Sequence, residues 1–169
     1  MSIRPARTPF PHSFYNIGPT RADSIAYMFT PSSHDVRRFF CEVFRKNAAK
    51  EILTPLEAMA LDWVLEHPEY ADALVDVDTA LTRDYSVEGG QANPFLHLSM
   101  HLSISEQVSI DSPRGIRAAY EALARKLDST HEAQHEIMEC LGEMIWKSQR
   151  SGLPPDGEAY IDAVKRRAA

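Results

Sequence analysis

The apolar segment at residues 93–110 constrains the fold of this chain more than any other segment. Its sequence is NPFLHLSMHLSISEQVSI, and it carries a single formally charged side chain, Glu106. Apolar and polar residues alternate from Leu96 to Ser105, which is a pattern typical of a β-strand. The first question is therefore whether the segment is a strand or a helix.

Two observations favour a helix. Asn93 followed by Pro94 is a typical helix start, with a side chain that can cap the first turn and a proline at the first helical position. The neighbouring segments all have helical periodicity, so a single strand would have no partner. At about 100° per residue, the alternating apolar groups spread around the helix axis, as they do in a buried helix. The sequence predicts a buried helix over residues 94–110.

The other apolar patterns also repeat with the period of an α-helix. Thr54 and Glu57 have the spacing of a capping box, as do Ser129 and Glu132, and Asp156 can cap a last helix. Helices are predicted near residues 36–44, 54–67, 113–127, 129–152 and 156–164, with one or two short helices within 69–81. In the segment 54–67 the expected buried stripe is Leu56, Ala60, Trp63 and Val64. The predicted fold is all-α, with six or seven helices in antiparallel packing.

The first 27 residues differ in composition from the rest of the chain. They contain four prolines and three arginines, without the apolar run of a signal peptide. We expect residues 1–27 to be a poorly ordered extension and residues 28–169 to be a single helical domain. Met28 is a plausible natural start, and a targeting role for the extension is the alternative.

The bulk composition excludes several classes of protein. The net charge of −6 argues against a nucleic-acid-binding surface. No apolar run approaches the length of a membrane span, so a membrane protein is not expected. Cys41 and Cys140, in a chain without a secretory signal, are expected to be two reduced, buried thiols in a cytoplasmic protein.

Histidines at positions i and i+4 form the main chemical motif. His97 with His101 and His131 with His135 each lie on one helix face, where two imidazoles can reach one metal ion. Glu139 continues the same edge as the second pair. The candidate metal ligands are His97, His101, His131, His135 and Glu139, and the metals that suit imidazole are zinc or iron.

Other histidines and acids are less suitable as ligands than this set. Glu106 lies nine residues after His97, roughly on the opposite side of a regular helix, and is excluded as a partner. His67 precedes Pro68 and is interpreted as a helix boundary residue. Glu132 and His135 spell ExxH, but a di-iron carboxylate site needs two such motifs and two further glutamates.

Phosphate-binding loops and the nucleophile elbow GxSxG are absent from the sequence. Cys140 and His135 are five residues apart, away from a shared helix face, so they do not suggest a thiolate pair. The motifs therefore assign neither a catalytic residue nor an organic cofactor.

The segments NPFLHLSMHLSISEQVSID and HEAQHEIMECLGEMIWKSQRSG resemble a known bacterial family, the domain-of-unknown-function family numbered 1841. The stretches MFTPSSHDVRRFF and LTPLEAMALDWVLEHPEY support the resemblance, which covers about residues 28–165. It implies a helical fold in a bacterial cytoplasmic protein, and it implies no catalytic residue.

Two functional hypotheses follow. The first is a small interaction or scaffold protein, with a protein partner, whose histidines hold the core through hydrogen bonds. The second is a metal-binding helical protein, serving as a hydrolase or a redox enzyme. Four protein ligands would indicate a structural site, whereas three ligands and an open position could activate water.

Overall fold

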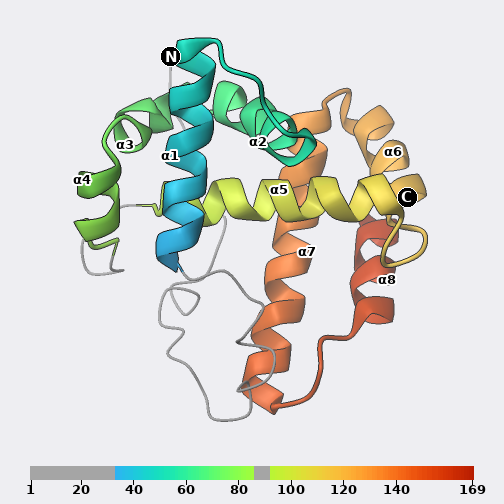
Figure 1. The fold of residues 1–169 in the computed structure, drawn as a ribbon. Coiled ribbons are helices and arrows are strands. Elements are labelled where there is room, and N and C mark those ends of the chain that lie inside the picture. Colours follow the sequence, from blue (N-terminus) through green and yellow to red (C-terminus); the bar gives the residue numbers. More distant parts are fainter. Residues whose placement is uncertain (1–32, 86–91) are drawn as a thin grey trace, which may run out of the picture. The chain divides into compact units, whose positions relative to one another are not determined.

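The computed structural model describes residues 33–85 and 92–169. These residues form eight α-helices and one short 3₁₀-helix, and no strand occurs among them (Figure 1). The all-α prediction is confirmed. The helix count exceeds the predicted six or seven by one, and the weakly patterned segment 69–82 contains two short helices, the larger of the two numbers predicted for it. The predicted extension at residues 1–27 and the candidate start at Met28 lie outside the described residues.

The described residues fall into two compact units, at 33–103 and 104–169. One helix, α5 (Pro94–Ile110), contributes its first ten residues to one unit and the rest to the other. None of the described helices has the length and apolar content that a bilayer span requires. The two units are described separately below.

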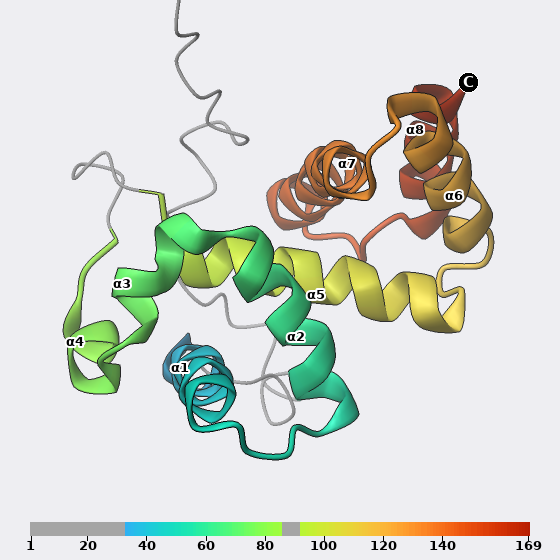
Figure 2. The ribbon, with the colours of Figure 1, turned by 90° about the horizontal axis from the view of Figure 1, so that it is seen from above.

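The unit at 33–103 is built around α1 (Ser33–Ala49), which lies between α2 (Pro55–Glu66) and α4 (Val77–Thr82) (Figure 2). The 3₁₀-helix Pro68–Tyr70 and α3 (Ala71–Leu74) connect α2 to α4. An apolar cluster of buried residues forms the core of this unit: Phe40, Cys41, Val43, Ala60, Trp63, Val64, Leu74, Ala80, Tyr85, Phe95, Leu98 and Leu102.

Helix α2 starts as the sequence predicts. The Thr54 side chain accepts from the Glu57 backbone N–H, and the Glu57 carboxylate accepts from the Thr54 N–H, so the capping box is complete. The predicted buried stripe is wrong at Leu56, which is 41% exposed. Leu56 lies in the first turn of α2. In that turn the buried side chain is Glu57, which accepts a hydrogen bond from Lys46.

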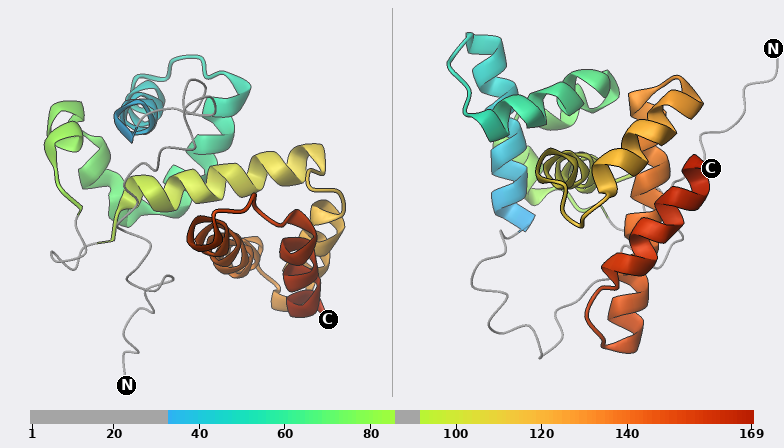
Figure 3. Two further views of the ribbon diagram at one scale, coloured as in Figure 1. Left: turned by 90° about the horizontal axis from the view of Figure 1, so that it is seen from below. Right: turned by 90° about the vertical axis from the view of Figure 1, so that its right-hand side faces the viewer.

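The unit at 104–169 packs α6 (Ile116–Leu127), α7 (Thr130–Ser151) and α8 (Gly157–Ala168) against one another. Ser129 and Asp156 cap α7 and α8 through their side chains, as predicted. Gly152 ends α7 at φ +69°, a left-handed conformation that favours glycine. After this turn, α8 returns along α7 in the opposite direction (Figure 3).

Helix α5 confirms the prediction made for the alternating segment. The Asn93 Oδ1 accepts from the backbone N–H groups of Phe95 and Leu96, which satisfies two donors of the first turn. Leu98 and Ile104, from the two halves of the helix, are both fully buried. Apolar residues on several sides of α5 are thus consistent with a buried helix.

Candidate metal centre

Helix α5 brings the first histidine pair together. His97 and His101 lie one turn apart on the helix, and their Nε2 atoms are 3.1 Å apart. His101 is fully buried, and His97 is partly exposed. The predicted i, i+4 geometry of this pair is present in the structure.

A third histidine, His67, joins this pair from the end of α2. Pro68 cannot continue the helix, because it has no N–H to donate, so His67 becomes the C-cap of α2 and the chain turns there. The turn places the His67 Nε2 3.0 Å from the His101 Nε2. His67 is 4% exposed. One nitrogen of each of the three histidines lies within 4.8 Å of the other two.

Hydrogen bonding among the rings is a poor explanation for this convergence. A neutral imidazole Nε2 carries either one N–H or one lone pair, directed along a single line in the ring plane. The His101 Nε2 lies within hydrogen-bonding distance of two other Nε2 atoms, and one proton or lone pair has to serve both.

A metal ion, by contrast, accepts a lone pair from each ring. With metal–nitrogen bonds of about 2.0–2.1 Å, ligand nitrogens lie about 2.9 Å apart at right angles and about 3.4 Å apart in a tetrahedron. The two Nε2–Nε2 distances, 3.0 and 3.1 Å, fall inside this range.

Glu69 forms a hydrogen bond with the second ring nitrogen of His67, its Nδ1. The His67 Nδ1 lies 2.8 Å from the Glu69 Oε1. Partial burial acts to raise the pKa of the Glu69 carboxyl. The hydrogen bonds from His67 and from the Glu69 backbone amide outweigh burial and hold this pKa below its ordinary value. Glu69 is therefore an ionised acceptor beside the cluster.

Two aromatic rings, those of Trp63 and Tyr70, contact the three histidines. The Trp63 ring stacks on His101 with centroids 4.1 Å apart and planes 10° apart. The Tyr70 ring stacks on His67 at 5.2 Å and meets the edge of His97 at 5.7 Å. These contacts fix the ring orientations and surround the nitrogens with apolar surface, which strengthens electrostatic interactions inside the cluster.

The other predicted ligands belong to the unit at 104–169. His131 and His135 lie on one face of α7, with ring centroids 4.4 Å apart, as their spacing predicts. The Glu139 carboxylate accepts from the Arg167 guanidinium at 2.8 Å. Glu106 is exposed on α5.

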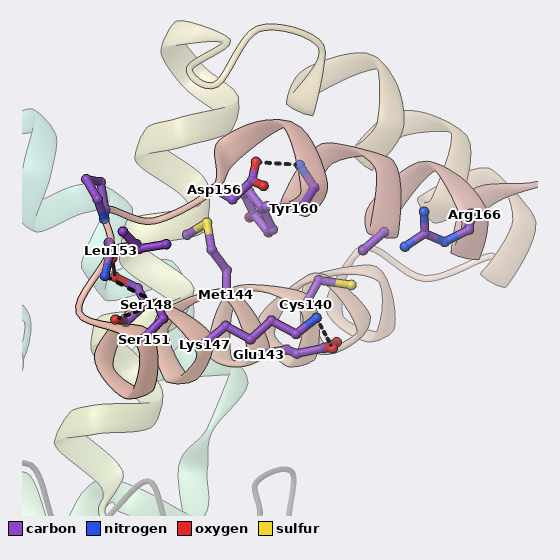
Figure 4. Close-up of a pocket in the computed structure, with 13 residues that line it drawn as sticks. Cys140, Glu143, Met144, Lys147, Ser148, Ser151, Leu153, Asp156, Tyr160 and Arg166 are labelled. Carbon is purple, nitrogen blue, oxygen red and sulfur yellow. Dashed lines mark hydrogen bonds and ion pairs between the residues drawn. The ribbon is translucent and has the colours of Figure 1, made fainter.

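Two cavities lie elsewhere, one in each unit. One, of about 340 Å³, opens between α7 and α8, where Figure 4 shows Lys147 paired with Glu143 and Met144 extending toward α8. Burial raises the pKa of the Cys140 thiol and of the Tyr160 hydroxyl that line it, so neither is an activated nucleophile. The other, of about 380 Å³, is lined by Cys41, whose pKa burial also raises. Both cysteines are free and buried, as expected.

His67 is a member of the cluster that the sequence does not predict. The spacing of 30 residues to His97 carries no periodic signal, since contact depends on how α2 packs against α5. A local signal does exist: a histidine at a helix end, followed by proline and then glutamate, places a carboxylate within reach of the imidazole Nδ1.

The fold and the site together define an all-helical protein with a buried, three-nitrogen candidate metal site. Residues 32–166 match the family model described as "Domain of unknown function (DUF1841)". The match covers most of the chain, so the chain belongs to this family, in agreement with the resemblance in its sequence. No curated protein and no solved structure matches the chain significantly.

Proposed function

We propose that this is a metal-binding protein in which His67, His97 and His101 bind one zinc or iron ion. The observation that supports this proposal is that the Nε2 atoms of His67 and His97 both lie 3.0–3.1 Å from the Nε2 of His101, a separation that metal ligands adopt, and that two of the three rings are buried. Imidazole nitrogen is a good donor for both metals.

The charge around His67 also favours a cation. Between residues 51 and 82 the chain carries eight acidic side chains and no lysine or arginine. Such a segment attracts divalent cations toward the site and disfavours anions. Acidic residues alone would not indicate a metal site, but here they accompany converging nitrogen ligands.

The test is metal binding by untagged protein. Protein expressed with added zinc and iron, then analysed for metal content, should contain about one equivalent of one metal per chain, as a mononuclear site requires. His67→Ala, His97→Ala and His101→Ala should each lose it. His34→Ala, at an exposed histidine of α1, is the matched control and should retain it. The proposal would be contradicted if folded wild-type protein from metal-supplemented medium contained less than about 0.1 equivalent of metal per chain.

Trp63 offers an independent optical test. Because its ring stacks on His101, a bound paramagnetic ion such as Co²⁺ should quench its fluorescence. The quenching should saturate at one equivalent and disappear in His101→Ala. Trp146→Phe removes the other tryptophan and should leave the quenching intact.

The contribution of the second histidine pair is a further part of the proposal. The sequence predicts that His131 and His135 add ligands, and His131→Ala and His135→Ala test each in turn. A loss of affinity in either variant would favour a four-ligand structural site. Unchanged affinity in both would favour three protein ligands with an open position, suited to a hydrolase or a redox enzyme.

The competing hypothesis is the interaction or scaffold protein with structural core histidines. It predicts that the histidine variants lose stability while no metal is bound by the wild type. Metal analysis and unfolding measurements on the same variants therefore separate the two functions.

A further inference from the structure

We propose that Glu69 is a positioning residue, which orients His67 and sets the affinity of the site for its metal. This inference rests on the proposed function. It assigns a role to a carboxylate that touches a ligand and that the sequence analysis did not single out.

The direction of the hydrogen bond decides what His67 can do. An ionised carboxylate only accepts hydrogen bonds, so the His67 Nδ1, 2.8 Å from the Glu69 Oε1, must carry a proton. In the neutral imidazole the Nε2 is then unprotonated, and its lone pair is available on the nitrogen that lies 3.0 Å from the His101 Nε2. This is the tautomer that binds a metal through Nε2.

The two partners of this hydrogen bond differ in their exposure to water. The His67 side chain is 5% exposed, whereas the Glu69 side chain is 57% exposed. The charge of Glu69 therefore stays largely in water, while the hydrogen bond acts on a ring that is shielded from water. A carboxylate on the outer nitrogen makes the imidazole a stronger donor and restricts its rotation.

Local backbone geometry explains why the carboxylate is two residues away. Pro68 fixes φ at the first position of the 3₁₀-helix, so the chain turns tightly and Glu69 returns alongside the His67 ring. Tyr70, the next residue, stacks on the same ring. Pro68 thus restrains the turn, Glu69 holds the proton on the His67 Nδ1, and Tyr70 restrains the plane of the His67 ring.

The experiment compares three variants of the full chain. Glu69→Ala removes the acceptor and should weaken Co²⁺ or Zn²⁺ binding by about 10- to 100-fold, measured by competition with a chelator. Glu69→Gln keeps an oxygen acceptor without the charge and should restore part of that loss. Asp72→Asn removes an exposed charge from the same acidic segment and should leave the affinity nearly unchanged.

A second measurement reads the tautomer directly and needs no metal. Long-range ¹H–¹⁵N spectra of the metal-free protein should show His67 protonated at Nδ1 in the wild type and in Glu69→Gln, and a mixture of tautomers in Glu69→Ala. A change in overall stability alone would not produce this pattern.

The outcomes separate this inference from the proposed function. A wild type that binds no metal overturns both. A wild type that binds metal, with equal affinity in Glu69→Ala and an unchanged His67 tautomer, overturns only the role of Glu69. An equal loss of affinity in Asp72→Asn would also overturn it, because the effect would then come from the general negative charge of the segment.

Discussion

Glu57 shows how one side chain can join a helix start to a neighbouring helix. One carboxylate oxygen accepts from the Thr54 backbone N–H at 2.8 Å, and the other accepts from the Lys46 ammonium of α1 at 2.7 Å. These bonds, first that from Lys46, hold the pKa of the Glu57 carboxyl below its ordinary value. The contact between α1 and α2 therefore depends on an ionised glutamate.

A lowered pKa in the folded state implies acid sensitivity. The stabilisation from Glu57 is fully present above the pKa of the unfolded chain, near 4.5, and is lost as the pH falls through the lower folded value. Glu57→Gln should unfold at lower urea concentration than the wild type at pH 7, and the gap should narrow as the pH approaches 3.

The control for this prediction is Asp62→Asn, an exposed acid on the same helix. It should show a small and pH-independent difference from the wild type. A Glu57→Gln gap that stays constant from pH 7 to pH 3 would contradict the assigned role of the carboxylate.

At the scale of the element, α5 depends on packing more than on an amphipathic pattern. Leu98 is fully buried in the cluster of the unit at 33–103. Leu98→Ala should lower the free energy of unfolding by about 2–5 kcal/mol, because it removes buried methyl groups and leaves a cavity.

Leu65→Ala is the matched control within the same unit. Leu65 is 60% exposed, so its truncation should cost no more than about 0.5 kcal/mol in urea unfolding. Equal losses for the two variants would show that the α5 face bearing Leu98 is not part of the core.

The elements differ in how well the sequence predicts them. Helix starts at Thr54, Asn93, Ser129 and Asp156 are local, since a side chain caps a backbone amide two or three residues away. They are all confirmed. The two short helices between residues 71 and 82 are less visible, because helices this short have little periodicity.

The residues of the candidate site also differ in whether local spacing or long-range packing brings them together. The pair His97 and His101 follows from helix geometry alone, as does the pair His131 and His135. His67 comes from a different helix, and its approach to His101 depends on packing across 34 residues of sequence. A single sequence contains no periodic signal for such a contact.

At the scale of the molecule, a metal held by residues 67, 97 and 101 would link distant parts of the chain. A ligand that binds only the folded state stabilises it by about 2.7 kcal/mol at a free concentration of 100 times its dissociation constant. For a chain of this size, that corresponds to a rise of about 5–10 °C in Tm.

The measurement is thermal unfolding by circular dichroism, with chelator and with added Zn²⁺. The wild type should show the rise, His101→Ala should not, and His34→Ala should match the wild type. Identical melting curves for the wild type with and without metal would contradict a folded-state metal site.

The continuity of α5 also determines where this protein can be divided. Residues 103 and 104 belong to different units, yet both lie inside one unbroken helix from Pro94 to Ile110. A protease needs an extended, accessible segment, and a helix interior does not offer one. Limited digestion should therefore leave this junction intact, and a gene fragment that ends there would break a helix in its middle. Each unit is compact, but both contain part of α5. We therefore expect the two units to be inherited together and not exchanged as independent modules.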